Sequence, residues 1–164
     1  MLAKLLLALC CIAACEGGWV NLGHGCTSAR GNHPALLTYR GKSGFVSAFR
    51  LTHIRGKIGC HANGRTNWGC TAHHRTNMYV TDVRNVVMYP SPVLVKPFQS
   101  GGWYHIPGYF ENSPQLAFSD VGPRYVYSGY QMRVWYGEDL YGYTEGDNHG
   151  HTCFKAEIFV VYYA

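Results

Sequence analysis

The sequence predicts an all-β protein, a disulfide-bonded β-sandwich of jelly-roll type, with a small β-barrel as the alternative. Short apolar and aromatic runs alternate with Gly, Asn, Ser and Pro, and 20 of the 164 residues are glycine. No long helical pattern follows the first 17 residues. Aromatic and β-branched runs bounded by such turn residues are typical of strands, so we expect roughly seven or more short ones.

Residues 1–17 are predicted to be a secretory signal peptide that is cleaved. Lys4 precedes an apolar run over residues 5–14 that ends in small residues, as such peptides do. The run is too short to span a bilayer, which takes roughly 20 apolar residues. Residues 12–15 (IAAC) also have the form of a bacterial lipoprotein box, which is the alternative for this segment. The mature chain, residues 18–164, then forms a single β-rich extracellular domain.

The mature chain keeps four cysteines, and an even number in a secreted protein predicts disulfides. Cys60 and Cys70 are close in the sequence and can close a small loop. Cys26 with Cys153 would then tie the beginning of the domain to its end, although the other pairings stay open. No N-glycosylation is expected, because the best candidate acceptor, residues 112–114, reads Asn-Ser-Pro.

The run 153–163 has the strongest strand character. Phe154, Ile158 and Val160 face one way, and the other face turns apolar towards the end of the run. A strand that is apolar on both faces is usually central, so we expect it in the middle of the sandwich. Prolines divide residues 90–115, which predicts a long irregular connection. The other predicted strands are 45–54, 78–80 paired with 86–89, 116–118, 125–127 and 131–136.

An acidic stretch, residues 133–153 (RVWYGEDLYGYTEGDNHGHTC), joins two predicted strands and contains four of the nine acidic residues. Calcium takes about six to eight oxygen ligands, commonly from glycine-containing loops, although the spacing here is not that of an EF-hand. The alternative is a solvated hairpin loop whose acids pair with Arg133 or Lys155. The predicted calcium ligands are Glu138, Asp139, Glu145, Asp147 and Asn148.

Histidines offer a second type of metal site. His149 and His151 would share one face of an extended segment, and His61 and residues 73–74 lie near two cysteines. Zinc or copper accepts such nitrogens. The spacing is not that of a zinc finger and the cysteines are expected to form disulfides, so surface histidines are the alternative.

A basic field covers the first half of the domain. Nine Lys or Arg residues stand against one acid, Asp82, between positions 30 and 84. Such a field attracts extracellular polyanions, with nucleic acid not expected, and nearby aromatic side chains offer surfaces on which sugars stack. The alternatives are a solvated basic face and ordinary core aromatics. The predicted ligand-binding residues are Arg55, Lys57, Arg65, Trp68, Arg75, Trp103, Tyr104 and Tyr109.

Several motifs resemble secreted modules of corals and sea anemones. They are WYGEDL (135–140) and TEGDNHG (144–150) before Cys153, with FRLTH (49–53) and YHIPGYFENSPQL (104–116) upstream. The resemblance implies an extracellular setting and no particular reaction. Lys155 departs from the Val-Asp continuation expected after the cysteine. If an acid at that position completes a metal site in relatives, the lysine weakens the calcium prediction.

These observations predict a secreted, non-enzymatic binding or adhesion module for anionic or carbohydrate ligands, assisted by calcium and no other cofactor. The expected partners are extracellular polyanions, glycans or matrix proteins. A structural matrix component without a small ligand is the second hypothesis. A hydrolase using two carboxylates from Glu138, Asp139 and Glu145 is the third, because G-x-S-x-G, H-E-x-x-H and Cys–His patterns do not occur. The sequence contains no second apolar run, so no transmembrane segment is predicted.

Overall fold

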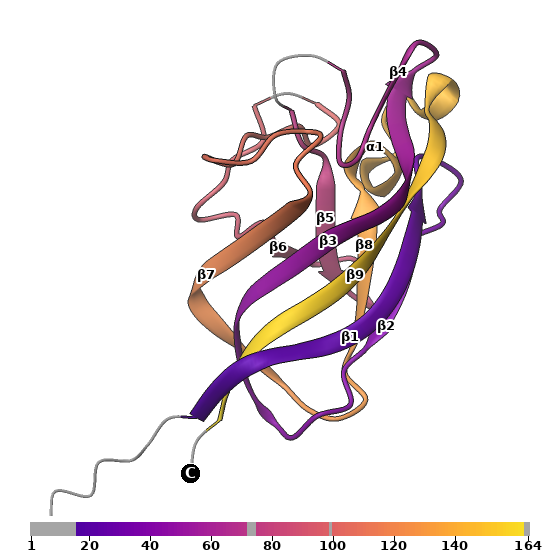
Figure 1. Ribbon diagram of the computed structural model, residues 1–164. Coiled ribbons are helices and arrows are strands. Elements are labelled where there is room, and N and C mark those ends of the chain that lie inside the picture. Colours follow the sequence, from indigo (N-terminus) through magenta and orange to yellow (C-terminus); the bar gives the residue numbers. More distant parts are fainter. Residues whose placement is uncertain (1–15, 72–74, 99, 163–164) are drawn as a thin grey trace, which may run out of the picture.

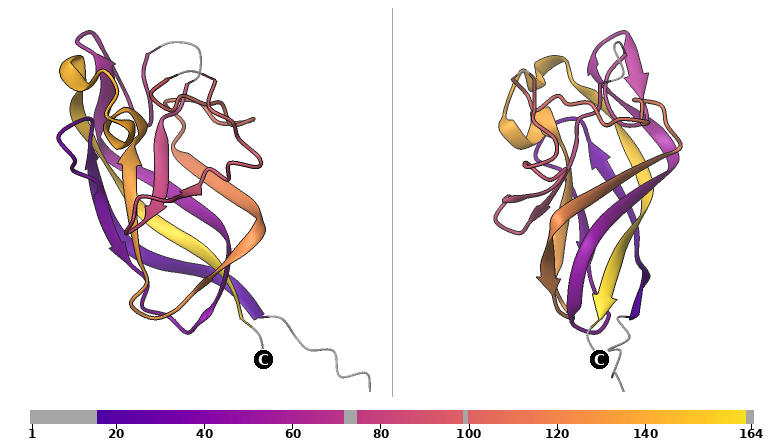
Figure 2. Two further views of the ribbon diagram at one scale, coloured as in Figure 1. Left: turned by 180° about the vertical axis from the view of Figure 1, so that it is seen from behind. Right: turned by 90° about the vertical axis from the view of Figure 1, so that its left-hand side faces the viewer.

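Two antiparallel β-sheets pack face to face, which confirms the predicted sandwich and corrects the alternative of a closed barrel (Figures 1 and 2). The computed structural model describes residues 16–71, 75–98 and 100–162. The elements are β1 (Glu16–Ser28), β2 (Ala35–Thr38), β3 (Gly44–His61), β4 (Gly64–Thr66), β5 (Met78–Asp82), β6 (Val87–Tyr89), β7 (Gln115–Val126), β8 (Gln131–Tyr136), α1 (Gly137–Tyr141), the 3-10 turn η1 (Glu145–Asp147) and β9 (His149–Tyr162).

The larger sheet has the strand order β1-β9-β3-β4, with β7 also paired to β3, and the smaller sheet has the order β2-β8-β5-β6. The start of β1 and the end of β9 lie at one end of the sandwich, whereas α1 and η1 lie at the other (Figure 1). The sheets enclose one apolar core. Its fully buried side chains include Phe49, Leu51, Ile58, Val80, Val134, Phe154, Ile158 and Val160.

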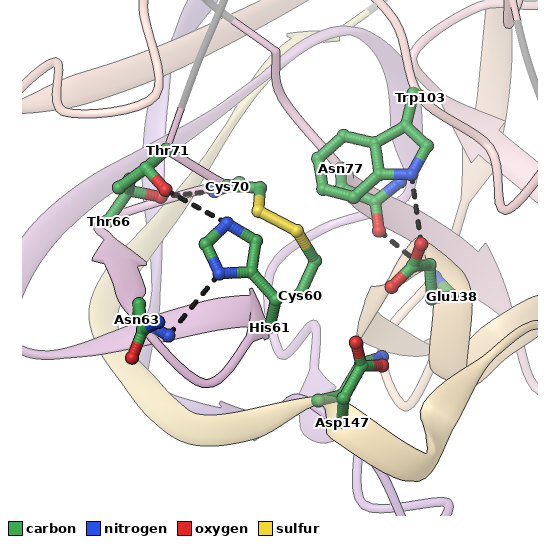
Figure 3. Close-up of a disulfide and its surroundings, with 12 residues drawn as sticks. Cys60, His61, Asn63, Thr66, Cys70, Thr71, Asn77, Trp103, Glu138 and Asp147 are labelled. Carbon is green, nitrogen blue, oxygen red and sulfur yellow. Dashed lines mark hydrogen bonds between the residues drawn. A yellow bond between two sulfur atoms is a disulfide. The ribbon is translucent and has the colours of Figure 1, made fainter.

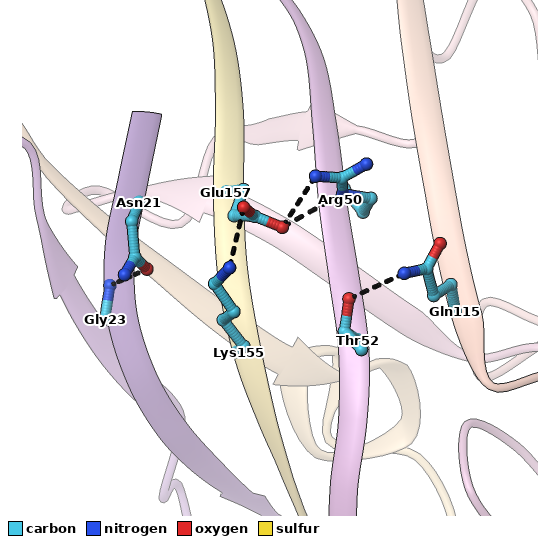
Figure 4. A network of polar contacts seen from close by, with 7 residues as sticks. All are labelled: Asn21, Gly23, Arg50, Thr52, Gln115, Lys155 and Glu157. Atoms are coloured by element: carbon cyan, nitrogen blue, oxygen red, sulfur yellow. Dashed lines mark hydrogen bonds and ion pairs between the residues drawn. The ribbon is translucent and has the colours of Figure 1, made fainter. Parts of the chain in front are cut away.

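The strand predicted to be central, β9, is hydrogen-bonded to β1 on one side and to β3 on the other. Its inward residues Phe154 and Ile158 are fully buried. Its outward residues carry charge instead. Glu157 accepts hydrogen bonds from Arg50 at 2.8 Å and from Lys155 at 2.9 Å (Figure 4). The outward face is therefore polar in its middle and becomes apolar only near the end of the strand.

Other predicted strands lie where they were expected but differ in length. Residues 78–80 and 86–89 form the predicted hairpin β5–β6, and the 45–54 strand continues to His61. The run 116–118 and residues 125–126 of the second run belong to one irregular strand, β7, because its pairing with β3 continues across a register shift. The described residues between β6 and β7, 90–98 and 100–114, contain no strand and make only isolated bridges, as the prolines predict.

The sequence did not predict β1, because its glycines hide its strand character. Those glycines permit close packing. A Cβ on Gly25 would lie 2.7 Å from the Cβ of Ala35, and one on Gly17 would lie 3.0 Å from the ring of Phe159. The short strands β2 and β4 were missed for a different reason. Each pairs over only a few residues, which is too short for an alternation of apolar and polar residues to be recognised.

Both favoured disulfides are present. Cys26 bonds Cys153 across the paired strands β1 and β9, and Cys60 at the end of β3 bonds Cys70. Their sequence separations are 127 and 10 residues. No helix in the described ranges is long and apolar enough to cross a membrane.

We expect the two disulfides to contribute unequally to stability. In the chain-entropy model, the loop closed by Cys26–Cys153 gives about 5 kcal/mol and that closed by Cys60–Cys70 about 3 kcal/mol. Urea denaturation of the double variants Cys26→Ser/Cys153→Ser and Cys60→Ser/Cys70→Ser therefore gives losses that differ by about 2 kcal/mol. Equal losses, or a larger loss for the short loop, would contradict this order.

Candidate functional site

The acidic stretch folds at one end of the sandwich. β8 leads directly into α1, η1 follows, and Asn148 leads into β9. The sequence predicted a hairpin loop here, and the structure replaces part of that loop by the five-residue helix α1. This helix brings Glu138 and Asp139 into the protein, where their exposed fractions are 5% and 2%. The first part of the stretch is therefore buried, whereas residues 141–147 are largely exposed, as the loop alternative predicts.

Glu138 lies at the centre of the site. Its Oε1 accepts a hydrogen bond of 3.0 Å from the indole N–H of Trp103, and its backbone N–H donates to Oδ1 of Asn77 at 3.0 Å (Figure 3). Its other carboxylate oxygen, Oε2, is buried and accepts no close hydrogen bond among the described residues, although the side chains of Asn148 and Thr144 lie near enough to lower the pKa of the carboxyl. A buried, ionised carboxylate without donors destabilises the fold unless the group is protonated or a cation compensates its negative charge.

Asp147 and Asn148 approach Glu138 from the far end of the stretch. Burial raises the pKa of the Glu138 carboxyl, and the negative charge of Asp147 raises it further, against the Trp103 N–H and the Asn148 side chain, which lower it. Asn148 is fully buried and donates to the Ala29 carbonyl at 3.1 Å. Its Oδ1 has no donor in the described part of the chain. Three oxygen-bearing side chains, those of Glu138, Asp147 and Asn148, therefore lie near one another, and we call this cluster the acidic pocket.

The two other predicted ligands hold a neighbouring loop, residues 29–34. Asp139 Oδ1 accepts the Asn32 backbone N–H at 2.9 Å, and Glu145 Oε2 accepts the Gly31 N–H at 3.3 Å. The second oxygen of Asp139, Oδ2, is buried and has no donor among the described residues. Asp139 thus holds the loop with one oxygen and leaves its other oxygen without a donor. Glu145 contacts the loop through its bond to Gly31.

Sequence reasoning missed the residues that build the pocket wall. Asn77 is fully buried and joins α1 to the 101–103 segment, because its Nδ2 donates to the Gly101 carbonyl at 2.9 Å. Gly101 has φ +80°, and a Cβ there would lie 2.9 Å from Cγ of Glu138. The pair Gly101-Gly102 directly before Trp103 was the available signal, since adjacent glycines permit a close backbone approach.

The acidic side chains of this stretch, all of which the structure describes, do not bring three carboxylates together. Among the described residues, the group of three or more His, Cys, Asp or Glu side chains whose ligand atoms lie within 4.8 Å of one another is Cys60, His61 and Cys70. Glu138 Oε2, Asp139 Oδ2 and Asn148 Oδ1 are buried oxygens without donors in the described chain, and Asp147 adds an exposed carboxylate. Carboxylate and amide oxygens are the side-chain ligands that calcium prefers. Lys155 does not affect these oxygens. It lies on the outer face of β9, paired with Glu157, so position 155 does not face the pocket.

The histidines do not assemble a zinc or copper site in the described ranges. Cys60, His61 and Cys70 lie within 4.8 Å of one another, but both sulfurs belong to the disulfide and are not thiolate ligands. The ring of His61 instead bonds the Thr71 hydroxyl at 3.1 Å (Figure 3). His149 and His151 lie on β9 next to β3, and residues 73–74 lie outside the described residues.

The predicted ligand-binding residues separate into a core set and a surface set. Trp68 and Tyr104 are fully buried, so the expectation that they stack against a sugar is corrected. Trp103 is 2% exposed and serves the pocket through Glu138, while Tyr109 is half-buried against the core. The basic residues lie elsewhere, with Arg55, Lys57 and Arg65 exposed on β3 and β4 and Arg75 over the ring of Phe98.

Fold and site together define a two-disulfide β-sandwich with a cluster of acidic and amide side chains at one end. A solved structure, AJLec from the sea anemone Anthopleura japonica, is similar to this chain, with a TM-score of 0.80 and 32% sequence identity. The match covers 90% of this chain and 98% of that chain. The chain therefore belongs to the same family as AJLec. No protein-family model and no curated protein sequence matches it.

The substitution Glu138→Gln is expected to stabilise the protein at neutral pH in the presence of a chelator. A carboxyl whose pKa is raised in the folded state costs nothing below its ordinary pKa, but destabilises the fold as pH rises through the raised value. Glutamine keeps an acceptor for Trp103 and removes the buried charge. Melting temperatures should therefore increase at pH 7, and the increase should vanish below about pH 4.

Glu157→Gln is the matched control. Lys155, together with Arg50, lowers the pKa of Glu157, so its charged form supports the fold at neutral pH and that support is lost as pH falls. The substitution should lower the melting temperature at pH 7. If both variants shift the melting temperature in the same direction at pH 7, the ionised carboxylate of Glu138 does not destabilise the fold.

Proposed function

We propose that the chain is a secreted, non-enzymatic carbohydrate-binding module of lectin type, with its sugar site at the acidic pocket. The observation that carries the proposal is the set of buried oxygens without donors on Glu138, Asp139 and Asn148. The family relationship supports it, because the name of AJLec is that of a lectin-like protein. Two disulfides and the absence of a membrane-spanning helix from the described residues agree with an extracellular location.

Calcium is part of this proposal. Glu138, Asp147 and Asn148 would hold the ion, and Asp139 Oδ2 would contribute to the negative field around it. A bound calcium ion supplies an oxygen-seeking centre whose remaining positions sugar hydroxyls can fill. Trp103 and Asn77 position Glu138 through the hydrogen bonds described above. The hydrogen bonds from Asn32 and Gly31 hold the neighbouring loop against the same stretch.

The exposed basic residues support a second, anionic component of binding. Arg55, Lys57 and Arg65 project from β3 and β4 and give that surface a positive field. Their contribution to affinity falls with salt, because exposed charges are screened beyond about 10 Å at 0.1 M ionic strength. A structural matrix protein would use the same surface without a sugar pocket, and the binding experiments below separate the two functions.

Calcium is expected to raise the melting temperature by roughly 5–10 °C at a concentration about 100 times its dissociation constant. The physical reason is that the ion binds only the folded pocket and compensates its buried charge. Differential scanning calorimetry with calcium and with EDTA measures the shift. Asp147→Asn should reduce it, whereas the control Glu157→Gln should keep it. An unchanged melting temperature with and without EDTA would remove calcium from the proposal.

A glycan array run with calcium and with EDTA tests the carbohydrate function itself. We expect binding to a defined set of glycans that disappears with EDTA and is weakened at least about tenfold by Asp147→Asn. Binding to no glycan, together with self-association, would favour the matrix component. Turnover of a sugar or ester substrate that is lost on Glu138→Gln or Asp139→Asn would identify a hydrolase and overturn the proposal.

A further inference from the structure

A groove lies beside the 29–34 loop. It has a volume of about 560 Å³ and runs between β1, this loop, β2 and β8. Leu36 on β2 and Arg133 on β8 are register partners, and they alternate with the buried residues Ala35 and Val134. Both side chains therefore project from the outer surface of the smaller sheet. A groove of this size suits one or two sugar rings.

The groove offers hydrogen-bond donors and no acid. Its polar lining consists of Ser28, Asn32, His33, Asn85, Arg133 and Trp135, and none of its nine lining residues carries a carboxylate. The carboxylates that bond the 29–34 loop, those of Asp139 and Glu145, accept its backbone N–H groups. The two sites therefore have opposite character, because one is rich in oxygen acceptors and the other in N–H donors.

Arg133 is held in a fixed position. One of its terminal nitrogens donates to Oδ1 of Asn85 at 2.9 Å, and Asn85 sits in the β5–β6 turn with φ 62°. This bond uses one of the five N–H donors of a guanidinium group. A guanidinium oriented by a neighbouring amide is suited to a planar carboxylate or a sulfate, which it can bind with two parallel hydrogen bonds.

Trp135 supplies an independent sign of a ligand. Its side chain lines the groove and is 4% exposed, and its indole N–H is buried without an acceptor among the described residues. Two other indoles are satisfied, since Trp68 donates to the Ser113 carbonyl and Trp103 to Glu138. A buried N–H that bonds nothing is rare in folded proteins and calls for an acceptor.

We propose that this groove is a second binding site, which takes the anionic group of an acidic saccharide, either a carboxylate or a sulfate ester. Arg133 and the Trp135 N–H hold the anion, and the exposed side chain of Leu36 contacts the sugar ring. The site does not depend on the acidic pocket or on calcium, because the anion is bound by protein donors alone.

Indole N–H signals in ¹H–¹⁵N spectra test the proposal directly, because the chain has four tryptophans and each gives one signal. The probes are a sulfated heparin disaccharide, its desulfated form and glucuronic acid, each titrated in the presence of EDTA. The Trp135 signal, assigned with Trp135→Phe, should shift with the sulfated disaccharide, with glucuronic acid, or with both. The signal of Trp68, already bonded to Ser113 at 2.6 Å, should stay in place.

Substitutions locate the anion. Arg133→Gln should weaken binding at least about tenfold, because it removes a charge-assisted pair. Asn85→Gly keeps the positive-φ turn and releases the guanidinium, so it should weaken binding by a smaller factor. Arg55→Gln, an exposed arginine of the larger sheet, is the control and should leave binding unchanged.

Three results would overturn the site. They are no binding of the sulfated disaccharide, its desulfated form or glucuronic acid, binding that Arg133→Gln leaves intact, and a Trp135 signal unmoved at saturation. A shift of the Trp103 signal instead would place the ligand at Glu138. Because EDTA is present throughout, failure here is distinguishable from failure of the calcium-dependent sugar site.

Discussion

The pairing of β9 with both of its neighbours is the constraint on which the other features depend. Its register with β1 sets Cys153 opposite Cys26, and its register with β3 sets His149 opposite Gly59. The backbone N–H of Ala29 bonds the Gly150 carbonyl at 3.1 Å, so the chain after β1 is fixed to the first residues of β9. A slip of this strand by one residue would turn every inward side chain outward and displace the acidic pocket.

The buried acids lower the stability of the fold, and the paired strands and disulfides offset this loss. α1 buries two consecutive acids at the end of β8, and only some of their oxygens receive donors from the described residues. Buried carboxylates in that state reduce stability unless a cation joins them. The apolar core between the sheets and two disulfides supply stability elsewhere, so the fold can hold the acids in place before any ligand arrives. Such preorganisation lowers the cost of ordering the site on binding.

The sequence predicts the architecture well and the site only in part, for physical reasons. Composition and period-two alternation identify β9, β5–β6 and the irregular 90–115 connection, because those signals are local. Glycine-rich β1 has no such signal, and its strand character comes from pairing with β9. The sequence shows the acidic residues as a cluster, but it does not show which of them lie together in the folded protein. That depends on Asn77 and Gly101, which are distant in sequence from Glu138 and reach it only through tertiary contacts.

The 29–34 loop contacts both proposed sites, which have opposite polarity. Its backbone N–H groups satisfy carboxylates of the acidic stretch, while Asn32 and His33 line the donor-rich groove. This opposite polarity has a chemical consequence, because an acid exposed to both sites would neutralise Arg133 and repel an anion. If both proposed sites bind saccharide, an extended glycan that carries both free hydroxyls and a sulfate or carboxylate engages them at once. Two weak contacts on one chain raise the apparent affinity through effective concentration, without either site being strong alone.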